Sequence, residues 1–187
     1  MKKKMKTFVE IGTCDFDTLY HLLEKGWKGV MIDPYKPFLD SFKDHPNLTK
    51  VCAAISTGET TVDYYYLNDE TITEWQDDQY RGLGSISPDS IMHNHDAYIG
   101  RLNKIQVPTR TFNSLMEELK ITEIDYLKVD TEGLDFDILK SIDYNKFLIT
   151  LIKAETNYCN PNHMGSFLDD NGYHIEYFSN DIIAIKY

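Results

Sequence analysis

Carboxylates follow the apolar segments of this chain at the points where those segments end. Glu10 and Gly12 close the first segment, FVEIG, and Asp33 follows GVMI. Further along, Asp130 follows YLKV, and Glu155 closes TLIKAE. In an open parallel sheet, ligands bind beyond the carboxyl ends of the strands, so we expect these side chains to line one crevice. Carboxylates there could accept hydrogen bonds from ribose hydroxyls, take up a proton or bind a cation.

The first loop and the acid after the second segment indicate an adenosine-type ligand. Asp33 lies 21 positions after Gly12, the spacing at which a carboxylate on a second strand binds ribose. Cys14 and Asp17 occupy positions where a loop that binds pyrophosphate would keep glycines. Because Asp15 and Asp17 would repel a phosphate, we expect S-adenosylmethionine, whose sulfonium and ammonium groups are attracted to acids.

Apolar runs alternate with helical patterns, which predicts an α/β fold with a mostly parallel sheet. The expected strands are residues 8–12, 29–34, 49–56, 60–67, 105–112, 124–130, 147–155, 173–178 and 181–187. Asp15 or Asp17 is expected to cap a first helix that ends at Gly26. Ser114 begins a capping box for a later helix, and another helix is capped near Asp135. Residues 161–171 are expected to be helical, and the last two strands form a hairpin.

A chain of 187 residues is most simply one domain, 1–187. Its core is expected to comprise residues 7–67 and 105–187. The intervening residues 68–104 exceed the usual loop length, so we expect a lid or a substrate-binding insertion. Just before it, the alternation in DYYYL places Tyr64 and Tyr66 on one face, where they either cover a ligand ring or form a small core.

The composition restricts the partners of this protein. It has 30 acidic and 19 basic residues, and the resulting net charge of -11 disfavours nucleic acid. Three cysteines without CxxC spacing argue against disulfides and a zinc site. No apolar run reaches the length of a signal peptide or a membrane span, so we expect a cytoplasmic protein without a membrane partner. The residues leave the oligomeric state open.

The chain resembles the FkbM-type family of class I S-adenosylmethionine-dependent methyltransferases. The resemblance lies in FVEIGTCDFDT, GVMIDPYKP, VCAAIS and the long stretch VPTRTFNSLMEELKITEIDYLKVDTEGLDFDILKSI. It implies a Rossmann-like class I fold, in which helices cover both faces of a mostly parallel seven-stranded sheet that ends in a C-terminal antiparallel hairpin. It also implies methyl transfer to a hydroxyl of a small-molecule or carbohydrate acceptor. The cofactor-binding residues that it implies are Glu10, Gly12 and Thr13 for the methionine part, Asp33 for the ribose, and Tyr35, Ala54, Ile55 and Ser56 around the adenine.

Methyl transfer to a hydroxyl requires a group that removes the proton. Asp130 and Glu132 could act as the base directly, and so could His93 or His95 in the insertion. Alternatively, a divalent cation such as magnesium could lower the pKa of the hydroxyl. Oxygen ligands for it are available on Asp130, Glu155 and Asn157, an arrangement similar to that of catechol-type O-methyltransferases.

Two other functions stay open at this point. A nicotinamide-dependent oxidoreductase would use the same kind of sheet, although the missing glycines count against it. A catalytically silent module that binds an adenosine ligand would keep the fold without the chemistry. Binding of S-adenosylmethionine and of NADH distinguishes the methyltransferase from the oxidoreductase, and methyl release with a panel of acceptors distinguishes an enzyme from the silent module.

Overall fold

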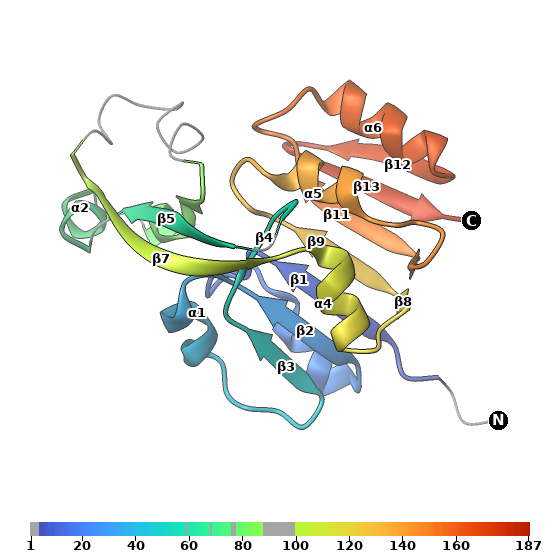
Figure 1. The fold of residues 1–187 in the computed structure, drawn as a ribbon, viewed down its shortest axis with the longest axis horizontal. Coiled ribbons are helices and arrows are strands. Elements are labelled where there is room, and N and C mark those ends of the chain that lie inside the picture. The colour runs from blue at the N-terminus through green and yellow to red at the C-terminus, as the bar shows by residue number, and fades with distance from the viewer. Residues whose placement is uncertain (1–3, 59, 68, 76–77, 88–99) are drawn as a thin grey trace.

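The computed structural model describes residues 4–58, 60–67, 69–75, 78–87 and 100–187. They form a mixed α/β structure in which a second, smaller sheet extends from the edge of a large one (Figure 1). Among these residues, no helix has both the length and the apolar character needed to cross a membrane. His93 and His95 lie outside the described residues.

The large sheet has seven strands and is mixed. Its order is β3 (Leu48–Val51), β2 (Lys28–Ile32), β1 (Thr7–Ile11), β9 (Tyr126–Val129), β11 (Leu151–Glu155), β13 (Asp181–Lys186) and β12 (Tyr173–Phe178). Strand β13 runs antiparallel to both of its neighbours, and the pairings among the other strands are parallel. The predicted C-terminal hairpin, formed by β12 and β13, is confirmed.

A second sheet combines β4 (Ala54–Ile55), β7 (Leu102–Arg110), β5 (Thr61–Leu67) and β6 (Gly84–Ser85), in that order. Its longest strand pairing is the antiparallel one between β5 and β7, which aligns Thr61 with Pro108 and Leu67 with Leu102. Two very short strands, β8 (Glu123–Ile124) and β10 (Leu148–Ile149), pair separately. Strand β7 therefore begins within the segment expected to be an insertion, and β6 lies wholly inside that segment.

Two predicted strands, 49–56 and 147–155, are each divided in the structure. The first breaks after Val51, where the Ala53 amide donates to the Val51 carbonyl in a tight turn. Ala54 then pairs with Thr109 in the second sheet. The second breaks at Thr150, whose amide donates to Ile124 instead of continuing either strand. Neither break contains the glycine or proline that marks a turn in a sequence.

The helical segments are η1 (Leu19–Lys25, a 3-10 helix), α1 (Lys36–Ser41), α2 (Asp69–Trp75), η2 (Asp78–Gly82, 3-10), α4 (Phe112–Glu118), α5 (Asp135–Ser141) and α6 (Pro161–Asp170). Gly26 ends η1 with a left-handed backbone, as predicted. The predicted caps at Asp15 or Asp17 and at Ser114 are wrong. Thr18 and Thr111 accept the capping hydrogen bonds instead, because the helical hydrogen bonds begin one to three residues away from the acids or the serine.

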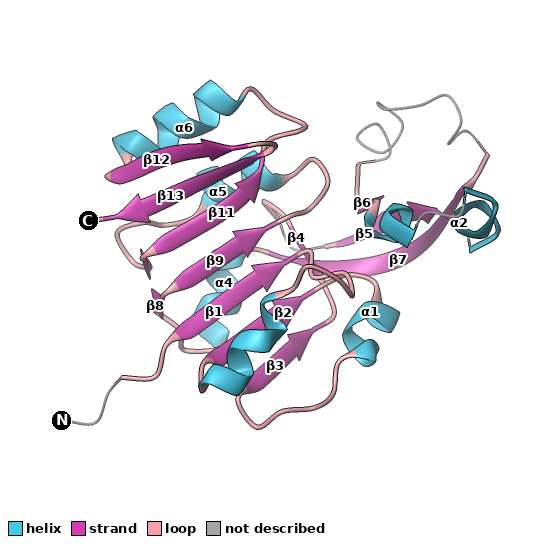
Figure 2. Ribbon diagram, turned by 180° about the vertical axis from the view of Figure 1, so that it is seen from behind, coloured by secondary structure: helices cyan, strands magenta, loops and turns pink. Residues whose placement is uncertain are grey.

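Helices cover both faces of the large sheet (Figure 2). Side chains of β1 alternate between these two layers, since successive residues of a strand point to opposite faces. Val9 and Ile11 pack in the core cluster that also contains residues of α4, α5 and α6, whereas Phe8 packs with Leu19 and other residues of η1. This alternation places Glu10 on the same side as Phe8, inside the protein.

Candidate functional site

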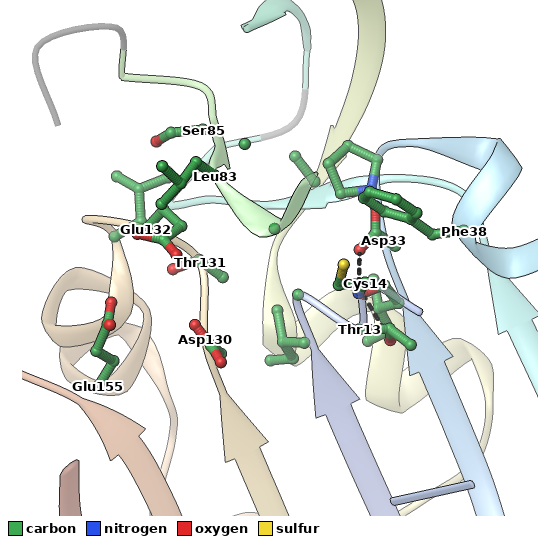
Figure 3. A pocket seen from close by; sticks show the side chains of 18 of the residues that line it. Thr13, Cys14, Asp33, Phe38, Leu83, Ser85, Asp130, Thr131, Glu132 and Glu155 are labelled. Atoms are coloured by element: carbon green, nitrogen blue, oxygen red, sulfur yellow. Dashed lines mark hydrogen bonds between the residues drawn. The ribbon is translucent and has the colours of Figure 1, made fainter. Parts of the chain in front are cut away.

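A cavity of about 390 Å³ lies at the carboxyl ends of the large sheet's strands. Its lining comes from the loops after β1, β2 and β9, from residues 53–55, and from the end of β11 at Glu155 with Asn157 and Tyr158 beyond it. Residues 82–86, around β6, supply its roof. Figure 3 shows Asp33 at one end and Asp130, with its neighbouring acids, at the other. The volume is in the range of cavities that bind small molecules, roughly 300–1,000 Å³.

The loop after β1 touches the loop after β9 at Gly12. A Cβ atom at Gly12 would lie 1.6 Å from the carbonyl oxygen of Asp130, and the Gly12 backbone is left-handed at φ 76°. Cys14 and Asp17 also have left-handed backbones, at φ 47° and 50°. Cys14 and Asp17 thus have a backbone conformation that glycine adopts without strain. This conformation costs a residue with a side chain roughly 1–2 kcal/mol.

Asp33 marks one end of the cavity. It follows β2 directly and is 3% exposed. Its carboxylate accepts hydrogen bonds from the backbone amides of Cys14 (3.0 Å) and Tyr35 (2.7 Å). Burial raises the pKa of Asp33 to about 6, although these amides oppose the change. The side chain is therefore charged at neutral pH and keeps further lone pairs for a ligand in the cavity.

Glu10 lies outside the cavity lining and is fully buried. Its carboxylate accepts hydrogen bonds from the Leu19 amide, the closer at 3.0 Å, and lies 3.5 Å from Lys128 Nζ. Burial raises the pKa of Glu10 to about 7, and the charge of Lys128 opposes this rise. Glu10 thus fixes the start of η1 and the position of Lys128, which itself lines the cavity.

Lys128 connects three parts of the site from inside β9. Its side chain is only 4% exposed. The ammonium donates to the carbonyl of Asp17 at 2.5 Å and lies 3.8 Å from the carboxylate of Asp130. It therefore holds the left-handed Asp17 in place while compensating Glu10 beneath the cavity.

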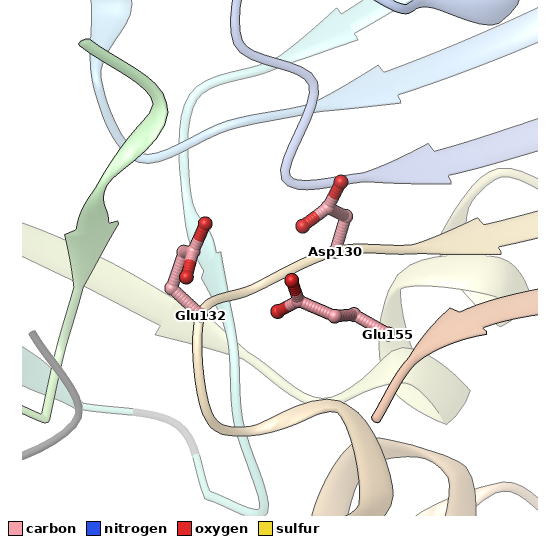
Figure 4. A group of neighbouring side chains, drawn as sticks. All are labelled: Asp130, Glu132 and Glu155. Atoms are coloured by element: carbon pink, nitrogen blue, oxygen red, sulfur yellow. The ribbon is translucent and has the colours of Figure 1, made fainter. Parts of the chain in front are cut away.

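Three carboxylates meet at the opposite end of the cavity from Asp33. One oxygen from each of Asp130, Glu132 and Glu155 lies within 4.8 Å of the others, and Figure 4 shows the side chains converging. Burial and mutual repulsion raise the pKa of Glu132 to about 7 and that of Glu155 to about 9. Glu155 Oε2 is buried without a hydrogen-bond partner among the described residues. The cluster therefore keeps protons at neutral pH unless a cation compensates its charge.

The loop that carries Glu132 is held from two sides. Tyr158 donates its hydroxyl hydrogen bond to Glu132 at 2.7 Å. The buried carboxylate of Asp135 accepts from the amide and hydroxyl of Thr131 and from the amide of Gly133. Glu132 itself has a left-handed backbone, at φ 53°. These contacts fix the direction of a carboxylate that an ordinary loop would leave mobile.

Arg81 and Gly82, at the start of the roof, contact the acidic loop after β1. Arg81 lies 3.2 Å from the carboxylate of Asp15. A Cβ atom at Gly82 would be 3.0 Å from the ring of Phe16, so these two segments touch. Asp15, which the sequence left as either a cap or a ligand contact, instead forms an ion pair with the segment above the cavity.

The structure brings most of the predicted site residues together. Those that line the cavity are Gly12, Thr13, Asp33, Ala54, Ile55, Asp130, Glu132, Glu155 and Asn157. Tyr35 and Ser56 do not line it, nor does Glu10. Asn157 donates a hydrogen bond to Glu155, and Glu132 completes the group of three carboxylates. The predicted role of His95 stays a prediction, because that residue lies outside the described part of the chain.

Sequence reasoning missed Tyr158 and the central role of Lys128. Tyr64 and Tyr66, which the alternation placed on one face, pack together in a small core, and Tyr64 also lines the cavity. A signal for Lys128 was present, since a lysine within the apolar run YLKV must be paired when the strand is buried. Tyr158 carries no comparable signal, because its place depends on how distant segments pack.

An α/β structure with an acidic cavity at its strand ends defines a class of small-ligand-binding proteins, many of them enzymes. The family model for the methyltransferase FkbM domain matches residues 9–175, so the chain belongs to the FkbM methyltransferase family. The predicted family is confirmed. No curated protein matches the chain.

Proposed function

We propose that this protein is an S-adenosylmethionine-dependent methyltransferase that methylates a hydroxyl of a small molecule or glycan. The observation that carries the proposal is one cavity with Asp33 at one end and a group of proton-holding carboxylates at the other. The order of the large sheet, with β13 as its antiparallel strand, supports a Rossmann-like class I fold.

The charges of the cavity favour a cationic methyl donor. Its described lining contains five acidic side chains, and Lys128 is its one cation among those residues. The cluster of Asp130, Glu132 and Glu155 holds protons in the unliganded cavity and loses them more readily when a cation approaches. Lys128 is already paired with Glu10. A sulfonium is attracted to such a lining, whereas the diphosphate of a nicotinamide cofactor is repelled. This electrostatic argument, together with the family, favours the methyltransferase over the oxidoreductase.

We assign Glu132 as the base for the acceptor hydroxyl. Methyl transfer breaks the bond between sulfur and the methyl carbon, forms a bond from that carbon to the acceptor oxygen, and releases the hydroxyl proton. A carboxylate whose pKa is about 7 can take that proton at neutral pH. The hydrogen bond from Tyr158 orients Glu132. Asp130 is the alternative base from the same loop.

We also propose that a divalent cation binds at the same end of the cavity. Carboxylate oxygens of Asp130, Glu132 and Glu155 are the ligands that magnesium prefers, and Glu155 Oε2 has no other partner among the described residues. A bound cation would lower the pKa of a nearby hydroxyl. Addition of magnesium should then raise the thermal midpoint of the wild type but not of Glu155→Gln, and a chelator should abolish methyl transfer. Equal midpoints with and without magnesium would leave Glu132 as the base without a cation.

Calorimetric titration with S-adenosylhomocysteine, S-adenosylmethionine and NADH tests the cofactor. We expect binding of the first two and none of NADH. Asp33→Ala should weaken the binding of S-adenosylhomocysteine by about tenfold or more, because it removes charge-assisted hydrogen bonds. Asp40→Ala, which removes an exposed carboxylate of α1, is the matched control. Exclusive binding of NADH would refute the proposal.

Methyl transfer to a panel of hydroxyl compounds tests the reaction. Formation of S-adenosylhomocysteine that depends on the acceptor is expected for the wild type. A protein that binds the cofactor but transfers no methyl group to any sugar, polyol or phenol would instead be the silent binding module.

A further inference from the structure

Tyr64 reaches the cavity from outside the large sheet. It lies on β5, and its side chain lines the cavity although the residue is only 5% exposed. Its hydroxyl forms no hydrogen bond with the residues that the structure describes. A phenol that is buried in this way faces the inside of the cavity with an unused polar group.

The ring of Tyr64 is fixed by its surroundings. It packs in a small core with Ala54 and Val107 and is nearly parallel to the ring of Tyr66, at 6.3 Å between centroids. A Cβ atom at Gly84 would lie 1.7 Å from the Tyr64 hydroxyl oxygen, so the backbone of the roof rests directly on this oxygen. The hydroxyl therefore has a defined position between the roof and the cavity.

The surroundings of Tyr64 lie toward the Asp33 end of the cavity. Its small core includes Ala54, which lines the cavity, and Tyr35, whose backbone amide donates to Asp33. Burial, followed by the charge of Asp33, raises the pKa of Tyr64 well above its ordinary value. The hydroxyl thus keeps its proton at neutral pH and can donate it to an oxygen or nitrogen atom of a ligand.

We propose that Tyr64 binds the nucleoside of the methyl donor by donating its hydroxyl hydrogen bond to the ribose or the adenine. This inference rests on the proposed function and adds a cofactor contact that comes from the second sheet. It also explains why Gly84 has no side chain, because any side chain there would displace the hydroxyl. If Tyr64 only filled a small core, phenylalanine would serve equally, because the hydroxyl has no hydrogen-bond partner among the described residues.

The variant Tyr64→Phe tests the inference in the full-length protein, with S-adenosylhomocysteine and adenosine as separate probes. Calorimetry should show about three- to tenfold weaker binding of both compounds, as expected for the loss of one neutral hydrogen bond. Binding should weaken by the same factor for the two probes, because the contact is made to the nucleoside that they share. Tyr65→Phe is the matched control, since Tyr65 lies on the same strand, outside the cavity lining, with its hydroxyl 3.4 Å from Asp63.

The unliganded thermal midpoint separates a binding role from a structural one. For Tyr64→Phe we expect a midpoint equal to or above that of the wild type, because the hydroxyl has no partner to lose. Unchanged affinity for both probes would overturn the inference while leaving the proposed function intact. A midpoint several degrees lower would overturn it too, by showing a structural role. Wild-type protein that binds neither probe would overturn the proposed function and the inference together.

Discussion

Lys128→Met should destabilise the protein strongly at neutral to alkaline pH. The substitution keeps the length of the side chain but leaves the fully buried carboxylate of Glu10 without its cation, 3.5 Å away in the wild type. Removing one partner of a buried ion pair typically costs 3–5 kcal/mol. The Asp17 carbonyl also loses its hydrogen bond from the ammonium. We therefore expect the free energy of unfolding at pH 8 to fall by about 3 kcal/mol or more.

The pH dependence identifies the cause of this loss. The pKa of Glu10 is already raised to about 7, and without the opposing charge of Lys128 it should rise further. A carboxyl whose pKa is higher in the folded state stabilises the fold when protonated and loses that contribution as the pH rises through the folded-state pKa. The deficit of Lys128→Met relative to the wild type should accordingly be smaller at pH 5.5 than at pH 8.

Urea unfolding followed by far-UV circular dichroism provides the measurement. The double variant Glu10→Gln/Lys128→Met should be less destabilised at pH 8 than Lys128→Met, because no buried charge remains. Lys146→Met is the matched control: it removes a lysine of an exposed pair with Glu117 and should cost less than about 1 kcal/mol. The reasoning is refuted if Lys128→Met stays within 1 kcal/mol of the wild type, or if the double variant is no more stable.

Three further predictions concern the loops, the base and the whole protein. Gly12→Ala should cost at least about 2 kcal/mol more than Gly26→Ala in urea unfolding, since both glycines are left-handed but only Gly12 has a neighbour, the Asp130 carbonyl, in the way; equal losses would contradict the close contact. Glu132→Gln should lower kcat by about 100-fold or more, and wild-type kcat should rise with pH through about 7 as the carboxyl loses its proton; a flat profile would exclude Glu132 as the base. The thermal midpoint of the unliganded protein should fall by at least about 6 °C between pH 5 and pH 8.5, because the raised pKa of Glu10, about 7, alone corresponds to roughly 3 kcal/mol; a midpoint that rises with pH would show that these carboxyls are not desolvated.

The sequence predicted those features that depend on strand ends. Asp33 and Asp130 line one cavity because parallel strands bring their carboxyl ends to the same edge, and that rule needs no knowledge of packing. The hairpin of β12 and β13 was predictable for a similar reason, since two apolar runs flank Ser179 and Asn180. Local pattern and tertiary structure agree in these segments.

The sequence was insufficient where distant segments decide the structure. The break after Val51 occurs because Ala54 finds a partner in Thr109, more than fifty positions away, and nothing in VCAAIS announces it. The pairing of Asp15 with Arg81 likewise depends on the position of the roof. Tyr64 enters the cavity only because β5 leaves the large sheet and pairs with β7. Such features follow from long-range contacts that composition and periodicity do not encode.

The left-handed backbones of Cys14 and Asp17 have a consequence for how relatives of this protein are detected. A search for a glycine-rich first loop would pass over this chain, although Cys14 and Asp17 have the left-handed backbone angles for which such loops use glycine. A left-handed backbone can be kept without glycine where a partner holds the residue in place, as Lys128 does for Asp17. Comparing torsion angles, in addition to letters, should therefore recover distant members that glycine-based signatures discard.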